Sequence, residues 1–100
     1  MIVIKQCVKR DGRLVRFDRH RIQTAISKAF KESNEGNPNI AKKVTESVLE
    51  SISRSFVEMA PNVEEIQDAV EDTLMELKFR KTAKCYILYR EMRNRERDII

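Results

Sequence analysis

Seven cationic side chains lie within the first 22 residues of this 100-residue chain, on both sides of one short turn. They are Lys5, Lys9, Arg10, Arg13, Arg16, Arg19 and Arg21. Lysine and arginine bind phosphate through charge-assisted hydrogen bonds, and the free N–H groups of a helix N-terminus bind the same kind of anion. Asp18 is typical of an N-cap, which places a helix start beside these cations. The segment therefore suits phosphate binding, and a nucleotide is the first ligand to consider.

The charge of the chain is concentrated at its two ends. Residues 1–22 carry seven cations and two acids, a net charge of +5, and residues 78–97 carry eight cations and two acids, a net charge of +6. Between them, residues 58–77 carry seven acids and neither lysine nor arginine. If the ends meet in space, they form one electropositive site beside an acidic helix.

A β-hairpin is predicted at the start of the chain. Ile2-Val3-Ile4 and Val8 are β-branched and predict its first strand. Asp11-Gly12 favours a two-residue type I′ turn, since both central positions of that turn need a positive φ. The register that follows pairs Arg10 with Arg13, Lys9 with Leu14, Val8 with Val15, and Gln6 with Phe17.

This register decides which side chains share a face of the hairpin. It places Val8, Val15 and Phe17 together, and we expect that face to cover the helices, because an isolated two-stranded hairpin is marginally stable in water. It also points Lys9 and Arg10 to opposite faces.

Four helices are predicted after the hairpin, separated by a loop over residues 33–38 and a break over residues 59–62. Asn62 with Glu65 resembles a capping box at the start of the third helix. The predicted inward positions are Ile22, Ala25, Ile26, Ala29 and Phe30 in the first helix; Ile40, Val44, Val48, Ile52 and Phe56 in the second; Ile66, Ala69, Val70, Thr73, Leu74 and Leu77 in the third; and Ala83, Tyr86, Ile87 and Met92 in the fourth.

The fourth helix is expected to begin near Lys81, with its last turns, Arg90 to Arg97, in solvent. The predicted fold class is α+β, mainly α, with an N-terminal hairpin packed on a four-helix bundle. One domain accounts for this length.

Several function classes are disfavoured by composition. We find no nucleophile–base pair and no ligand cluster, so we expect no catalytic site in this chain. His20 is the only histidine and is expected on a helix surface, and the acids of the third helix are expected to be solvated rather than to bind metal. Cys7 and Cys85 form no CxxC motif and are expected to be buried free thiols. Without a signal peptide or an apolar run of about 18 residues, a cytoplasmic protein is expected.

One string carries a resemblance to a known family. Val8-Lys9-Arg10-Asp11-Gly12-Arg13-Leu14-Val15, followed by Phe17-Asp18 and Arg21-Ile22, resembles the opening signature of the ATP-cone family, the N-terminal allosteric nucleotide-binding domains of ribonucleotide reductases. The similarity continues over residues 63–71 and 83–90, and its Tyr-Ile-Leu-Tyr-Arg ending is most similar to the anaerobic and cobalamin-dependent reductases. It implies an ATP-cone domain over residues 1–93 and a charged tail over residues 94–100.

The resemblance also implies roles for individual residues. Lys9, Arg10 and Arg21 would contact the triphosphate, residues 15–22 would wrap the nucleotide with Ile22 against the base, and a late cation of the fourth helix, Arg90 or Arg93, would close the site. The implied nucleotide-binding residues are Lys9, Arg10, Val15, Arg16, Phe17, Asp18, Arg21, Ile22, Val63, Gln67 and Arg90. Arg21 stands where lysine is usual, which keeps the charge and changes the hydrogen-bond geometry.

The implied function is allosteric regulation without chemistry. ATP or dATP would control the overall activity of a reductase catalytic domain in cis or in trans, through a change of conformation or of homo-oligomeric state. A magnesium ion could arrive with the nucleotide. Neither a membrane nor a nucleic acid is an expected partner. Two alternatives are the ATP-cone of a transcriptional regulator, which would carry a CxxC zinc ribbon before the cone, and a small basic helical nucleic-acid binder.

Overall fold

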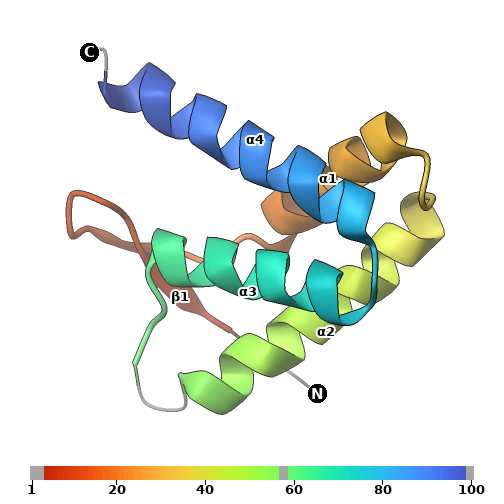
Figure 1. Ribbon diagram of the computed structural model, residues 1–100. Coiled ribbons are helices and arrows are strands. Elements are labelled where there is room, and N and C mark those ends of the chain that lie inside the picture. The colour runs from red at the N-terminus through yellow and green to blue at the C-terminus, as the bar shows by residue number, and fades with distance from the viewer. Residues whose placement is uncertain (1–3, 57–58, 99–100) are drawn as a thin grey trace.

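A two-stranded hairpin and four helices follow one another along the chain (Figure 1). The structure is a computed structural model, which describes residues 4–56 and 59–98, with side chains described through Glu96. The elements are β1 (Gln6–Val8), β2 (Leu14–Arg16), α1 (Arg19–Ser33), α2 (Pro38–Ser55), α3 (Val63–Glu76) and α4 (Arg80–Asp98). The predicted α+β, mainly α class is confirmed. Ile2 and Val3, predicted in the first strand, lie outside the described residues, and β1 begins only at Gln6.

Three helices begin at side-chain caps that the sequence signals locally. The Asp18 carboxylate accepts from the backbone N–H of His20, and the Asn37 side chain accepts from that of Ile40 ahead of α2. At α3 the predicted capping box is complete: Asn62 Oδ1 accepts from Glu65 N at 2.8 Å, and Glu65 Oε1 accepts from Asn62 N at 3.0 Å. Each cap satisfies backbone donors that have no partner inside the helix.

The N-terminus of α4 is capped from a distant loop. Glu35, between α1 and α2, accepts from the backbone N–H and the hydroxyl of Thr82 at 2.6 and 2.7 Å. The Ser33 hydroxyl lies 2.7 Å from that of Thr82, which is fully buried. These hydrogen bonds lower the pKa of Glu35, so the carboxylate stays ionised at the positive end of the helix dipole.

A tight turn separates α3 from α4 without glycine or proline. Lys78 adopts a left-handed conformation with φ of 67°. Its N–H donates to the carbonyl of Met75, and the N–H of Phe79 donates to that of Leu74. These are the two bonds of a Schellman motif, which ends α3 and turns the chain back so that α4 runs antiparallel to α3 (Figure 1).

The core lies between the four helices, with α1 and α2 contacting each other, α2 contacting α3, and α4 contacting both α3 and α1. Most of the predicted inward positions are buried or half-buried. Leu77 and Met92 are corrections, since they are 46% and 61% exposed. Leu77 lies where α3 ends, and Met92 lies on the outer side of α4, so neither meets a neighbouring helix. Tyr86 is buried, as predicted.

The hairpin has a different turn and register from those predicted. Gly12, with φ of 88°, donates its N–H to the carbonyl of Lys9, and Lys9 N donates to the carbonyl of Arg13. This is a three-residue loop in which glycine takes the left-handed position, a common alternative to the two-residue turn. The observed pairs are Gln6 with Arg16, Cys7 with Val15, and Val8 with Leu14.

This slip of one residue exchanges the two faces of one strand. Cys7 replaces Val8 beside Val15 and Phe17, and Cys7 and Phe17 pack against the helical core. Val8 shares the other face with Leu14, which is 54% exposed. The predicted grouping of Val8 with Val15 and Phe17 is therefore wrong.

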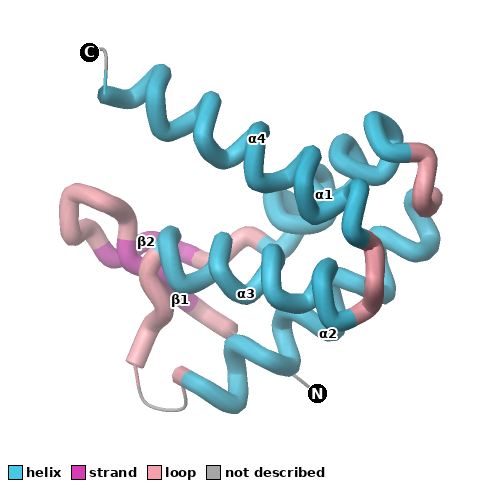
Figure 2. Tube along the Cα trace, in the orientation of Figure 1, coloured by secondary structure: helices cyan, strands magenta, loops and turns pink. Residues whose placement is uncertain are grey.

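Backbone pairing holds the hairpin against the segment before α3. Val8 N donates to the carbonyl of Pro61 at 2.9 Å, and Val8 forms an isolated parallel bridge with Asn62. The segment thus lies along β1 on the side away from β2 and leads directly into α3. Figure 2 shows the strands beside the first turn of α3.

Replacing Gly36 with alanine is expected to lower the free energy of unfolding by about 1–3 kcal/mol. An added Cβ would lie 2.6 Å from Cδ1 of Phe30, whose buried ring is held edge-on to Phe79 with 5.0 Å between centroids. Denaturant unfolding followed by circular dichroism measures the loss. In a background of Phe30→Leu the loss should shrink, because the smaller side chain leaves room. An unchanged unfolding midpoint for Gly36→Ala would contradict this packing.

Candidate functional site

Arg10 extends from the hairpin loop to both α3 and α4. Its Nη2 donates to Oε1 of Glu64 at 2.6 Å and also to Oδ1 of Asn94. Glu64 lies in the first turn of α3, and Asn94 lies in the C-terminal part of α4, which Figure 1 shows on the hairpin side of the molecule. The two basic ends of the sequence therefore meet beside the acidic helix, which is the condition that the sequence analysis set for a shared site.

Arg90 of α4 binds three carboxylates of α3. Its guanidinium donates to Glu64 Oε2 at 2.7 Å, to Asp68 Oδ1 at 2.9 Å and to Glu71 Oε1 at 2.7 Å. Only 14% of the Arg90 side chain is exposed. These three acids are spaced i, i+4 and i+7, which puts them on one face of α3 opposite α4.

Two predictions are corrected by this network. Arg90 is not solvated, and one face of the acidic helix is ion-paired rather than open to water, because the antiparallel packing of α3 and α4 brings their opposite charges together. Arg93 and Arg95 are exposed, as predicted, and the side chain of Arg97 lies outside the described part. The spacing of the acids is the signal that could have revealed the network from sequence.

The network changes the proton affinity of its members. Hydrogen bonds from Arg90, and the charge and hydrogen bond of Arg10, lower the pKa of Glu64 although partial burial acts against them. Burial disfavours the charged form of Arg90, but the hydrogen bonds that Arg90 donates to Glu64, Glu71 and Asp68 outweigh it and raise the Arg90 pKa. Glu64 and Arg90 are therefore both ionised at neutral pH.

Lys9 and Arg21 form a second group of cations, at the junction of the hairpin with α1. Burial raises the pKa of the Cys7 thiol, and the positive charges of Lys9 and Arg21 act in the opposite direction. Both cations therefore lie near enough to Cys7 for their charges to act on the thiol. Neither makes an ion pair with an acid among the described residues. Lys9 shares the face of Cys7 in the observed register, whereas Arg10 lies in the loop and turns away.

The remaining predicted site residues lie around this junction and on α3. Ile22 is buried in the core, Phe17 packs against it, and Asp18 is engaged as the cap of α1. Val15 is half-buried and Arg16 is exposed on the opposite face of β2. His20 is exposed on α1, as predicted.

Val63 and Gln67 lie one turn apart on α3 and are both half-buried. The side-chain oxygen of Gln67 is buried and has no hydrogen-bond partner among the described residues. A buried acceptor without a donor carries a desolvation cost that a bound donor would relieve.

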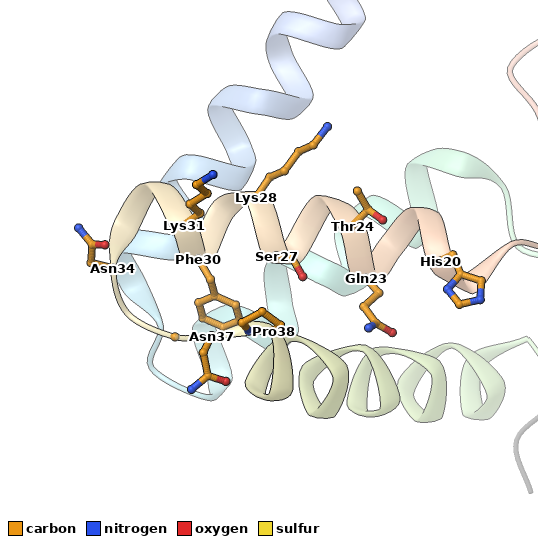
Figure 3. A pocket seen from close by; sticks show the side chains of 11 residues that line it. His20, Gln23, Thr24, Ser27, Lys28, Phe30, Lys31, Asn34, Asn37 and Pro38 are labelled. Carbon is orange, nitrogen blue, oxygen red and sulfur yellow. The ribbon is translucent and has the colours of Figure 1, made fainter.

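A groove of about 550 Å³ lies elsewhere, along α1 and the loop to α2. Figure 3 shows Phe30 pointing from α1 toward Asn37 and Pro38 at the start of α2, and Gln23 pointing toward a later turn of α2. None of the residues predicted to bind nucleotide lines this groove. No group of three or more histidine, cysteine or acidic side chains suited to a metal ion occurs in residues 4–56 and 59–98, and no helix there is long and apolar enough to cross a membrane.

Comparison with known proteins identifies the family of the chain. A family model of the ATP cone domain matches residues 5–95, from the hairpin through most of α4. The chain belongs to the ATP-cone family, whose members are allosteric nucleotide-binding regulatory domains of ribonucleotide reductases. The resemblance expected from the sequence is thereby confirmed.

Three relatives represent three kinds of reductase. The chain is 42% identical over 101 residues to a vitamin B12-dependent ribonucleoside-diphosphate reductase of Thermoplasma acidophilum, covering 96% of the chain and 13% of that protein. It is 36% identical to a ribonucleoside-diphosphate reductase subunit alpha of Chlamydia pneumoniae, covering 90% of the chain and 9% of the relative. It is also 36% identical to an anaerobic ribonucleoside-triphosphate reductase of Salmonella typhimurium, covering 91% of the chain and 12% of that relative.

Replacing Arg90 with glutamine is expected to lower the free energy of unfolding by about 1–3 kcal/mol, because three neighbouring carboxylates lose their counter-charge. Arg90→Lys should recover only part of this, since an ammonium cannot reproduce the planar fork of donors. Chemical denaturation measures both. Arg93→Gln, on an exposed part of α4, serves as the control and should change stability by less than about 0.5 kcal/mol.

The stabilisation that Glu64 provides should depend on pH. Its pKa is lower in the folded chain than the ordinary value of 4.5, so the contribution is complete above that value and is lost as the pH falls through the folded pKa. The difference in melting temperature between wild type and Glu64→Gln should therefore be largest near about pH 7 and shrink toward about pH 3. A difference that stays constant with pH would contradict this. Glu76→Gln, at the exposed end of α3, is the matched control.

Proposed function

We propose that this chain binds ATP or dATP between the hairpin, the start of α1 and the start of α3. The observation that carries the proposal is the pair of cations Lys9 and Arg21, whose charges both act on Cys7 and which form no ion pair with an acid among the described residues. Cations without an acidic counter-charge attract an anion, and lysine and arginine bind phosphate through charge-assisted hydrogen bonds. The N-terminus of α1 next to them adds favourable dipoles for a phosphate.

The proposed place of the adenine is against α3. Gln67 offers a buried acceptor without a donor, and the exocyclic amino group of adenine is a donor. Val63, one turn earlier, and Ile22 of α1 supply apolar surface for a base. Arg10 and Arg90 both bind Glu64 in the first turn of α3, and this pair of arginines is the proposed place for additional phosphate charge.

The proposed role of binding is regulatory. ATP and dATP differ by one 2′-hydroxyl, so their opposite signals depend on which conformation or oligomer each binds better. The regulated partner would be a reductase catalytic domain, in cis or in trans. The proposed compartment is the cytoplasm. A magnesium ion that arrives with the nucleotide would be coordinated mainly by phosphates and water. The division into residues 1–93 and a tail over 94–100 stays a prediction.

Lys9→Ala and Arg21→Ala are each expected to weaken ATP binding by about tenfold or more, because each variant loses one charge-assisted hydrogen bond to the phosphates. Titration calorimetry measures the affinity, and the thermal shift at saturating ATP should fall with it. Lys42→Ala, exposed on α2, is the control and should bind like wild type.

If the wild-type chain gives neither heat nor a melting shift with ATP or dATP, the proposed site is wrong. Steeply salt-dependent binding to DNA together with indifference to both nucleotides would instead identify the basic residues as a nucleic-acid surface.

A further inference from the structure

The Glu64 carboxylate is shared between two arginines from opposite ends of the sequence. Its Oε1 accepts from Arg10 at 2.6 Å, and its Oε2 accepts from Arg90 at 2.7 Å. Each oxygen thus serves a different guanidinium. Two oxygens of a phosphate group present the same kind of acceptor to a pair of arginines. The Glu64 carboxylate therefore bridges the hairpin and α4 in the way that a bound phosphate group would.

The two arginines are not equally dependent on Glu64. Arg90 also binds Asp68 and Glu71, so it keeps two carboxylates when Glu64 leaves. Arg10 has Glu64 as its only acidic partner among the described residues, together with the neutral Asn94. Loss of Glu64 therefore releases Arg10 and leaves α3 and α4 joined through Arg90.

Resting on the function proposed above, we propose that Glu64 is a positioning residue of the nucleotide site. Its carboxylate holds Arg10 between α3 and α4 in the empty chain, and a nucleotide phosphate takes Arg10 from it. The exchange is favourable because the phosphate carries more charge than the carboxylate. The contact between Arg10 and Glu64 nevertheless lowers the affinity for the nucleotide, because each binding event has to break it.

The exchange also changes a contact at the C-terminal end of α4. Arg10 donates to Asn94 and Glu64 through the same Nη2, so moving this guanidinium onto a phosphate alters its contact with Asn94. The occupied and empty states then differ in how the hairpin loop is held against the last turns of α4. A ligand that changes such a contact shifts the balance between two arrangements.

Glu64→Gln tests the proposal by the direction of its effect. The variant should bind ATP about tenfold more tightly than wild type in titration calorimetry, and inorganic tripolyphosphate should show the same gain. Glu76→Gln removes the same charge from the exposed end of α3 and should change either affinity less than twofold. A purely structural role for Glu64 predicts the opposite, weaker binding by a less ordered site.

A second variant keeps the test decisive if Glu64→Gln folds poorly. Glu64→Asp preserves the charge in the first turn of α3 but is one methylene too short to bridge both arginines, so it should also bind ATP more tightly. Equal or weaker binding by the folded variants, with normal binding by wild type, would overturn the role of Glu64 alone. Absence of ATP binding by wild type would overturn the nucleotide site itself, and this role with it.

Discussion

The arrangement of the molecule depends on the backbone pairing between Val8 and the segment that enters α3. A two-stranded hairpin has too little apolar surface to be stable by itself, so its position has to come from the helices. Pairing with residues 61 and 62 fixes β1 relative to the first turn of α3, and the apolar face with Cys7 and Phe17 closes against the core. The hairpin cations are thereby brought to α1 on one side and to α3 on the other.

The acidic helix divides the basic residues into two groups with different properties. Arg10 and Arg90 are neutralised by carboxylates of α3, which join the hairpin, α3 and α4. Lys9 and Arg21 form no ion pair with these acids among the described residues, and their charges act on Cys7. Basic residues thus join elements in one place and, in the proposed site, attract an anion in another, because Coulomb energy depends on which partners lie within a few ångströms.

Other contacts hold together the end of the bundle away from the hairpin. Glu35 caps α4 through Thr82, and Gly36 leaves room for the Phe30 ring, which packs edge-on to Phe79. These contacts join the loop between α1 and α2 to the start of α4.

The sequence by itself determined the helices and the starts of three of them, because caps such as Asp18 and the Asn62–Glu65 box act between residues close in the chain. It also indicated the family and the basic segment of the site. The tertiary structure decided the hairpin register, since Asp11-Gly12 fits loops of two or three residues and only packing against the helices selects one. It also decided the partners of Arg10 and Arg90, because an ion pair forms between whichever charges the packing brings together, and sequence distance does not determine that.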